Sequence, residues 1–236
     1  MYREFKKRFR TFKNWWRFIP PCNRARHNVV ARLRDGTKIL IRDIRSDDYT
    51  TLMDMACGDM YLLSEIKNPS VIVDVGAHIG IFSIIVARRF PNATVYAIEP
   101  DTENYQALLQ NIALNGLKNI SPLNAAVAGE YGSTPLYTSP SSVAHSTVDA
   151  TVGAETKMVD TIPLSKFPHI DVLKFDAEGA EYVVKEIPRT SYLAIEIHNI
   201  AGQDTGKLER EVMSKFHIIK KDVGKSGHIT LVGVGG

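Results

Sequence analysis

The stretch VIVDVGAHIG, residues 71–80, decides the fold predicted for this chain. Apolar, mostly β-branched residues lead into Asp74 and then into a turn bounded by Gly76 and Gly80. An apolar helical segment follows the turn. The pattern predicts a strand, a tight turn and a helix, an arrangement that presents backbone N–H groups to a nucleotide-like ligand.

A second apolar run, residues 94–98, ends at Glu99, where an acid can accept hydrogen bonds from ribose hydroxyls. Folds that bind NAD and folds that bind a methyl donor share this spacing. Here the glycines are four residues apart and Asp74 precedes them, which disfavours the anionic pyrophosphate of NAD. The pattern favours S-adenosylmethionine, whose amino group is cationic. The alternative is an ordinary strand-to-helix turn in which Asp74 only caps the helix.

The composition indicates one globular domain with an N-terminal appendage. The chain has 236 residues, of which 44% are hydrophobic and 23% charged. No apolar run approaches the ~20 residues that span a bilayer, and the N-terminus lacks the apolar core of a signal peptide. Cys22 and Cys57 lie far apart and have no C-x-x-C partner, which fits a reducing compartment. We therefore expect a cytoplasmic protein.

The net charge of +3 hides a strong asymmetry. Residues 1–34 hold eleven Lys and Arg and one acid, whereas the remainder holds 18 basic and 25 acidic side chains. The acidic body would not attract nucleic acid, so an anionic partner would meet the N-terminal segment.

Residues 1–19 alternate bases with aromatics and are predicted to form one helix. Phe5, Phe9, Phe12 and Trp16 are spaced so that one helix face would be apolar. Three interpretations stay open. The helix packs on the domain, lies on an anionic membrane as a peripheral contact, or binds RNA.

The rest of the chain predicts a mostly parallel sheet that ends in an antiparallel hairpin. A hairpin over residues 28–44 and a helix over 47–60, capped by Ser46 or Asp47, lead into it. Residues 129–159 form a long, turn-rich insert, predicted to be irregular and functional. The predicted strands are 71–75, 94–98, 120–124, 171–175, 192–197, 217–221 and 228–233, and the predicted helices are 80–90, 101–115, a segment from Ala180, and 207–215.

Five motifs resemble the FkbM-type family of S-adenosylmethionine-dependent methyltransferases. They are DVGAHIG at 74–80, AIEP at 97–100, residues 124–128, LKFDAEGAE at 173–181 and AIEIHN at 194–199. The resemblance implies an α/β class I methyltransferase (Rossmann-like) fold and S-adenosylmethionine as cofactor. It divides the chain into an extension, 1–27, and a methyltransferase domain, 28–236, with a lead-in over 28–70 and a Rossmann-like core over 71–236. His78 departs from the Asn expected in the glycine turn.

The resemblance also implies a donor pocket at the carboxyl edge of the sheet, where ligands of open α/β sheets bind. Asp74, Gly76 and Gly80 would line the methionine and ribose side, with His78 beside the donor and Glu99 on the ribose diol. Small residues would approach the adenine at Asn124, Ala125 and Ala126.

Catalytic candidates follow the fourth and fifth core strands. His198 is the first choice for general base because its free pKa lies near operating pH, with Asp176 and Glu178 orienting it or holding the acceptor. A divalent cation on Asp176, Glu196 and His198 is an alternative that we do not adopt, so no metal is predicted. Glu196 has a second interpretation, as an acid paired beneath the sheet. His145 is interpreted either as an exposed loop residue or as an acceptor contact.

The predicted reaction is O-methylation of a small-molecule or glycan hydroxyl. The turn after the fourth strand is Asp176-Ala177-Glu178-Gly179, whereas methyltransferases that modify amines carry a Pro-Pro-aromatic turn there. Two alternatives are an RNA-binding methyltransferase that docks through the basic arm, and a non-catalytic interaction module with the same fold. The acidic body makes a nucleic-acid partner the weaker prediction.

Overall fold

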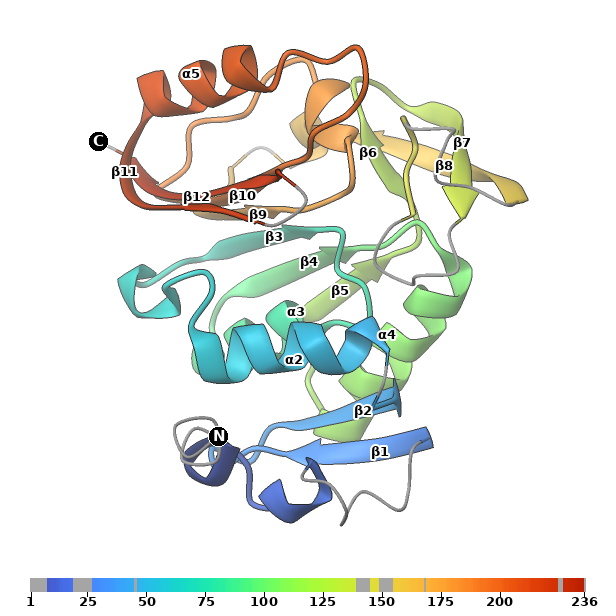
Figure 1. Ribbon diagram of the computed structural model, residues 1–236, viewed down its shortest axis with the longest axis vertical. Helices are drawn as coiled ribbons and strands as arrows, with labels where there is room; N and C mark the ends of the chain where they lie inside the picture. The colour runs from blue at the N-terminus through green and yellow to red at the C-terminus, as the bar shows by residue number, and fades with distance from the viewer. Residues whose placement is uncertain are drawn as a thin grey trace.

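The computed structural model describes residues 8–18, 27–44, 46–138, 145–148, 155–167, 169–224 and 227–235. Its centre is a seven-stranded sheet with helices on both faces (Figure 1). In order across the sheet, the strands are β11 (Phe216–Val223), β12 (Ile229–Gly235), β10 (Tyr192–Ile197), β9 (Val172–Phe175), β3 (Val71–Val75), β4 (Thr94–Ile98) and β5 (Ile120–Leu123).

The five strands from β10 to β5 run parallel, and β12 is antiparallel to both of its neighbours. The mostly parallel sheet and the terminal hairpin predicted from the sequence are confirmed. Because parallel strands point the same way, the residues that follow β3, β4, β9 and β10 meet at one edge. The functional candidates lie at that edge.

Alternation along β3 explains the two cores of the molecule. Ile72 belongs to the apolar cluster that also contains residues of α2 (Asp47–Gly58), α3 (Ile81–Arg89) and α4 (Thr102–Asn115). Val73 and Val75 belong to the cluster on the opposite face, which includes residues of α5 (Thr205–Lys215). Figure 1 shows these helices as layers on either side of the sheet. Such a strand is buried on both faces, as parallel-sheet strands commonly are.

The ends of α4 follow their local sequence signals. The Asp101 side chain accepts hydrogen bonds from the N–H groups of Glu103 and Asn104, which caps the helix. Gly116 ends it with a left-handed φ of 63°. Ser46 occupies the N-cap position of α2, but its hydroxyl donates to the Asp43 carbonyl instead of capping the helix.

The lead-in hairpin docks on α4 through two asparagines. The hairpin consists of β1 (His27–Arg32) and β2 (Lys38–Asp43), close to the predicted bounds. The Asn111 side chain accepts a hydrogen bond from Leu40 N at 2.6 Å and donates to Leu40 O at 3.2 Å. Asn115 pairs in the same way with both backbone groups of Lys38. These bonds satisfy a strand edge that would otherwise stay open.

The predicted helix from Ala180 is wrong. Only a short 3₁₀ turn forms there, η5 (Ala180–Tyr182), and an irregular segment follows. The sequence explains this, because the β-branched Val183 and Val184 follow directly and Pro188 blocks continuation of a helix.

The prediction of an irregular insert over residues 129–159 is wrong for its described parts. β7 (Gly132–Thr138) pairs antiparallel with β8 (Glu155–Pro163), which pairs parallel with β6 (Ala126–Ala128). These strands make a separate three-stranded sheet beside the carboxyl edge of the main sheet (Figure 1). Residues 139–144 and 149–154 lie outside the described part of the chain.

The N-terminal segment is not one continuous helix. In the described residues 8–18, helix stops at Phe12, which forms a β-bridge with Leu33, and a 3₁₀ turn, η1 (Trp15–Phe18), follows. The segment is held by Asn14, whose side chain donates to Val30 O and accepts from Arg32 N. Residues 1–7 and 19–26, including Phe5, lie outside the described part. The boundary predicted at residue 27 stays a prediction.

The predicted apolar stripe divides between the core and the surface. Of the stripe, Phe12 is fully buried, whereas Phe9 is 47% exposed and Trp16 51%. Phe18, which is not part of the stripe, is also buried. The first interpretation of the segment, packing on the domain, therefore applies to Phe12 and Phe18. Among the described helices, none is long and apolar enough to cross a bilayer.

We expect Phe12→Ala to lower the free energy of unfolding by about 3–5 kcal/mol, because the ring fills a closed core. Chemical denaturation measures this loss. Phe9→Ala is the matched control, and we expect it to cost under ~1 kcal/mol because the Phe9 ring is half exposed. Equal losses in the two variants would contradict the packing described for Phe12.

Candidate functional site

A cavity of about 570 Å³ lies at the carboxyl edge of the main sheet. The turn after β3 and the residues after β4 line one part of it, including Gly76, His78 and Glu99. The residues after β9 and β10, including Asp176 and His198, line another. A single cavity therefore brings the predicted donor site and the predicted catalytic site together.

Two other regions close the cavity. Thr51 and Met55 of α2, with Tyr61 after it, line the cavity from the lead-in, and Leu136 and His145 line it from the insert. No motif predicted a site residue in the lead-in. His145 is half-buried at the cavity wall, which agrees with the interpretation as a group within reach of the acceptor.

The glycine turn is shaped by neighbouring backbone. Gly76 has a φ of 73°, and a Cβ there would lie 1.8 Å from the carbonyl oxygen of Asp176. Gly80 has a φ of 86°, and a Cβ there would lie 2.4 Å from Leu108 Cδ1. Both positions favour glycine because φ is positive, and at Gly76 the backbone of the loop after β9 also leaves no room for a side chain. Gly80 does not line the cavity.

The N–H groups of the turn are used inside the protein. Those of Gly76 and Ala77 donate to the Ile98 carbonyl, and that of His78 donates to Glu99 Oε2 at 2.8 Å. The expectation that this turn offers its N–H groups to a ligand is therefore not met at these three positions. Instead, the turn fixes Glu99 in the wall of the cavity.

Glu99 is held by three donors and is 5% exposed. Besides His78 N, its carboxylate accepts from Asp101 N at 3.0 Å and from Asn104 Nδ2 at 3.4 Å. Burial raises the pKa of Glu99 to about 7, although the backbone hydrogen bonds oppose this rise. A carboxylate has about four lone-pair sites, so Glu99 keeps acceptor capacity for a ligand in the cavity.

His78 is buried beside a guanidinium. Arg42 Nη2 lies 3.0 Å from its Nε2, and Arg42 is paired with Asp48, whose Oδ1 lies 2.7 Å from Nη2. Burial lowers the pKa of His78 to about 4, so the ring is neutral at pH 7. Since guanidinium can only donate, Nε2 of His78 is the acceptor. His78 adopts a φ of 52°, a conformation that asparagine also tolerates.

Asp74 does not line the cavity, contrary to the prediction. It is fully buried, and its Oδ2 accepts from the Ser83 hydroxyl at 2.7 Å. Its Oδ1 lies 3.2 Å from Lys174 Nζ. Lys174 thus occupies the position beside Asp74 that was predicted for the cationic group of a donor.

Lys174 joins the loops that form the site. Its Nζ donates to Gly76 O at 2.7 Å and to Val75 O at 3.2 Å, and it lies 3.6 Å from Asp176 Oδ2. Burial alone would lower the pKa of Lys174, but the charges of Asp74 and Asp176 outweigh it and the pKa is raised. The buried cation therefore stays charged.

Of the three residues predicted to approach the adenine, two line the cavity and one does not. Ala125 and Ala126 line the cavity. Asn124 does not, because its side-chain amide donates to the carbonyls of Glu99 at 2.8 Å and Pro100 at 3.0 Å. Asn124 therefore holds the loop after β4, and the two alanines leave room above it.

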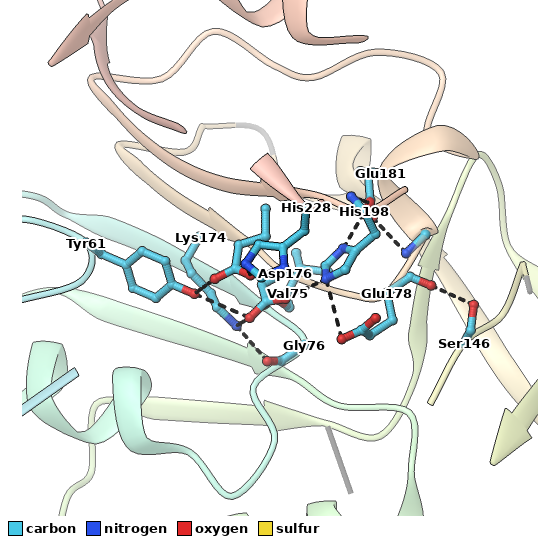
Figure 2. A network of polar contacts seen from close by, with 12 residues as sticks. Tyr61, Val75, Gly76, Ser146, Lys174, Asp176, Glu178, Glu181, His198 and His228 are labelled. Carbon is cyan, nitrogen blue, oxygen red and sulfur yellow. Dashed lines mark hydrogen bonds and ion pairs between the residues drawn. The ribbon is translucent and has the colours of Figure 1, made fainter. Parts of the chain in front are cut away.

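The predicted catalytic residues converge (Figure 2). His198 Nε2 lies 3.4 Å from Glu178 Oε1 and 3.8 Å from Asp176 Oδ1. On the other side of the ring, Nδ1 lies 3.1 Å from Glu181 Oε1, which also accepts from His198 N at 2.7 Å. Glu181 is fixed in turn by Gly179 N. The imidazole is therefore held between carboxylates on both sides.

The carboxylates around His198 contradict the prediction that its imidazole is the general base. Burial favours the neutral ring, but the hydrogen bonds with Glu178 and Glu181 and the charge of Asp176 outweigh it and raise the pKa to about 11. The ring is then an imidazolium at pH 7 and cannot accept a proton. The free pKa of histidine does not apply here, because sequence spacing does not reveal how many acids face one ring.

Tyr61 is a site residue that no motif predicted. Its hydroxyl donates to Glu196 Oε1 at 2.8 Å and lies 3.3 Å from Asp176 Oδ2 (Figure 2). Tyr192 holds Tyr61 in place by donating to its carbonyl. The hydroxyl is fully buried and its pKa is raised well above the ordinary value, so it remains a donor. No motif marks Tyr61, since it reaches the site from the lead-in.

Glu196 is the acid to which Tyr61 donates. Burial and the charge of Asp176 raise its pKa to about 8, so it is largely protonated at pH 7. His228, from the turn before β12, lies 3.8 Å from its Oε2. The residues that could hold a divalent cation differ from the set considered in the sequence. Oxygen and nitrogen atoms of Asp176, Glu178 and His198 lie within 4.8 Å of one another, with Glu178 in place of Glu196.

The strand order, with an antiparallel hairpin at one edge and a cavity at the carboxyl ends, defines a class I methyltransferase (Rossmann-like) fold, as predicted. Residues 74–187 match the family described as the methyltransferase FkbM domain. Residues 74–187 are therefore similar to the FkbM methyltransferase domain, the family predicted from the motifs.

The proteins to which this chain is similar include two curated relatives and a solved structure. Methyltransferase sdnD of Sordaria araneosa is 27% identical, over 52% of this chain and 62% of that protein. Methyltransferase 1 of Beauveria bassiana is 27% identical, over 51% of this chain and 59% of that protein. The chain thus spans less than two thirds of either relative. Methyltransferase FkbM of Methylobacillus flagellatus is 16% identical, with a TM-score of 0.48 over 70% of this chain and 44% of that one.

We expect Lys174→Met to lower the free energy of unfolding at pH 7 by about 3–5 kcal/mol, because it leaves the buried Asp74 carboxylate without its cation. Chemical denaturation measures the loss, and Lys166→Met, at an exposed position, is the matched control. Equal losses in the two variants would contradict the role described for the Lys174 ammonium.

Proposed function

We propose that this protein is an S-adenosylmethionine-dependent methyltransferase that acts on a hydroxyl of a small-molecule or glycan acceptor. One observation carries the proposal. A single cavity joins Glu99 and the glycine turn to the Asp176, Glu178 and His198 cluster. A donor and an acceptor bound in that cavity would meet at the carboxyl edge of the sheet.

The described residues fit the proposed donor. A volume of about 570 Å³ lies in the range of cavities that hold ligands of this size. Glu99 would accept from the ribose hydroxyls, and Ala125 and Ala126 would leave space for the adenine ring. Carboxylates at both ends of the cavity suit a ligand with cationic groups. When bound, the donor supplies an electrophilic methyl group on a sulfonium.

The protein's own residues would contribute by positioning the acceptor hydroxyl and by removing its proton. Methyl transfer to a hydroxyl requires the oxygen to be aligned with the methyl group and its proton to be accepted. We assign proton acceptance to Glu178, which is 29% exposed and faces His198. The His198 imidazolium holds Glu178 and Asp176 in place. Asp176 is tied to Lys174 and Tyr61, so it positions the acceptor.

The cluster supports an oxygen acceptor over an amine. The loop after β9 carries two carboxylates and no Pro-Pro-aromatic turn, and an ionised carboxylate can accept the proton of a hydroxyl. Burying charged groups around the cavity costs desolvation free energy, and a non-catalytic module would have no function for those charges.

The direct experiment measures donor binding by calorimetry and then methyl transfer to a panel of hydroxylated acceptors, with and without chelator. We expect donor binding, and transfer to a hydroxyl that survives chelation. Binding without transfer to any acceptor would favour the non-catalytic module. Transfer abolished by chelator would instead assign a divalent cation to Asp176, Glu178 and His198.

We expect Glu99→Gln to weaken donor binding about tenfold or more at pH 8, because a charge-assisted hydrogen bond contributes roughly 1.5–3 kcal/mol. Glu103→Gln, an exposed change in the same segment, is the control. The pKa of Glu99 is about 7 and the donor needs the ionised form, so wild-type affinity should fall as the pH drops below 7. Glu99→Gln should lose that dependence. Unchanged affinity in the folded variant would refute the ribose assignment.

We expect Glu178→Gln to lower kcat by about 10²–10⁴-fold with little change in donor affinity, since a positioned base typically contributes that much. Steady-state kinetics and calorimetry measure both quantities. Glu186→Gln, whose carboxylate is exposed and pairs with Lys215, is the matched control. Should Glu178→Gln keep full kcat while Asp176→Asn loses it, the proton would go to Asp176 instead.

A further inference from the structure

The N-terminal end of the molecule presents a surface that the donor and acceptor sites do not use. We call it the N-terminal patch, and its members are exposed bases and aromatics within residues 8–18. Phe9 and Trp16 are 47% and 51% exposed. The other members are the exposed Arg10, Lys13 and Arg17. Figure 1 shows this segment on the β1–β2 hairpin, at the opposite end of the molecule from α5.

Both exposed aromatic rings, Phe9 and Trp16, contact neighbouring side chains. The Phe9 ring lies 5.7 Å from Trp15 and 5.2 Å from the Arg34 guanidinium. Arg34 also donates two hydrogen bonds to Phe9 O, which fixes the backbone beside the ring. Trp16 packs edge-on against Trp15 at 6.2 Å. The fold therefore buries Phe12 and Phe18 in the core and leaves Phe9 and Trp16 half exposed.

Charge complementarity identifies the partner. Residues 1–34 carry eleven bases and one acid, whereas the remaining 202 residues carry seven more acids than bases. We propose that the N-terminal patch docks on a membrane surface that contains anionic lipids. Its arginines and lysine would meet the headgroup phosphates, and Phe9 and Trp16 would enter the headgroup boundary, where aromatic rings are favoured.

The charge distribution favours a membrane over RNA. A membrane is a plane, so it would touch the basic end and leave the acidic body in solution. A flexible nucleic acid strand could also run along the acidic body, and that part of the strand would be repelled. The surface also pairs half-exposed rings with bases, the combination typical of interfacial segments. This inference is independent of the proposed methyl transfer.

The test is sedimentation of the full-length protein with vesicles of phosphatidylcholine, with and without phosphatidylserine. We expect binding only when phosphatidylserine is present, with weakening by salt. Arg10→Gln/Lys13→Gln/Arg17→Gln should weaken binding about a hundredfold, given the usual contribution of each base near an anionic surface. The matched control, Lys118→Gln/Lys166→Gln/Lys207→Gln, removes the same charge from exposed positions on the body and should change binding little.

A second pair of variants separates insertion from simple charge attraction. Phe9→Ser/Trp16→Ser keeps the charge and should weaken vesicle binding about tenfold or more, because apolar area no longer enters the boundary. Tyr131→Ser/Met158→Ser, at exposed apolar positions elsewhere, is its control. Thermal unfolding verifies that each variant is folded.

Binding of oligouridylate RNA in place of vesicles, lost in the same variants, would overturn the proposal and establish the RNA alternative. Absence of binding to phosphatidylserine vesicles by the folded wild-type protein would also overturn it. Equal losses in the patch variants and in the body controls would show attraction by net charge alone, and that result too would reject the N-terminal patch as the docking surface.

Discussion

The buried ammonium of Lys174 is the interaction on which the arrangement of the site depends. It lies where β3 and β9 end, and its partners are the carbonyls of Val75 and Gly76 and the carboxylates of Asp74 and Asp176. Repulsion between two acids at the ends of adjacent strands would otherwise drive the loops apart. A cation between them allows the glycine turn to pack on the Asp176 carbonyl, where even a methyl group would not fit.

Charges are also paired in the residues around Lys174. Asp176 links it to Tyr61 and His198, and His198 is bracketed by Glu178 and Glu181. Each acid near the cavity is therefore matched by a cation or by a hydrogen-bond donor. The consequence is chemical, because a histidine set among carboxylates becomes a fixed cation and no longer a base. The proton acceptor must then be one of the acids.

The site is also wider than the matched family region, residues 74–187. The lead-in supplies Tyr61 directly, and Arg42 and Asp48 act through His78 in the glycine turn. β10 and the turn before β12 supply His198 and His228. The lead-in could not be recognised as part of the site from a motif, because Tyr61 and Glu196 are 135 positions apart and meet only when the sheet is complete.

The sequence by itself determined the strands of the main sheet, the terminal hairpin, the helix α4 and the edge at which the site lies. These features depend on local rules, namely alternation, capping and glycine turns, that neighbouring residues reveal. Only the tertiary structure decided that Asp74 faces Lys174 and not the cavity, that His198 is charged, and that Phe12 is core while Phe9 is surface. Those outcomes depend on which groups distant in the chain are brought into contact, since burial and neighbouring charge set both packing and protonation.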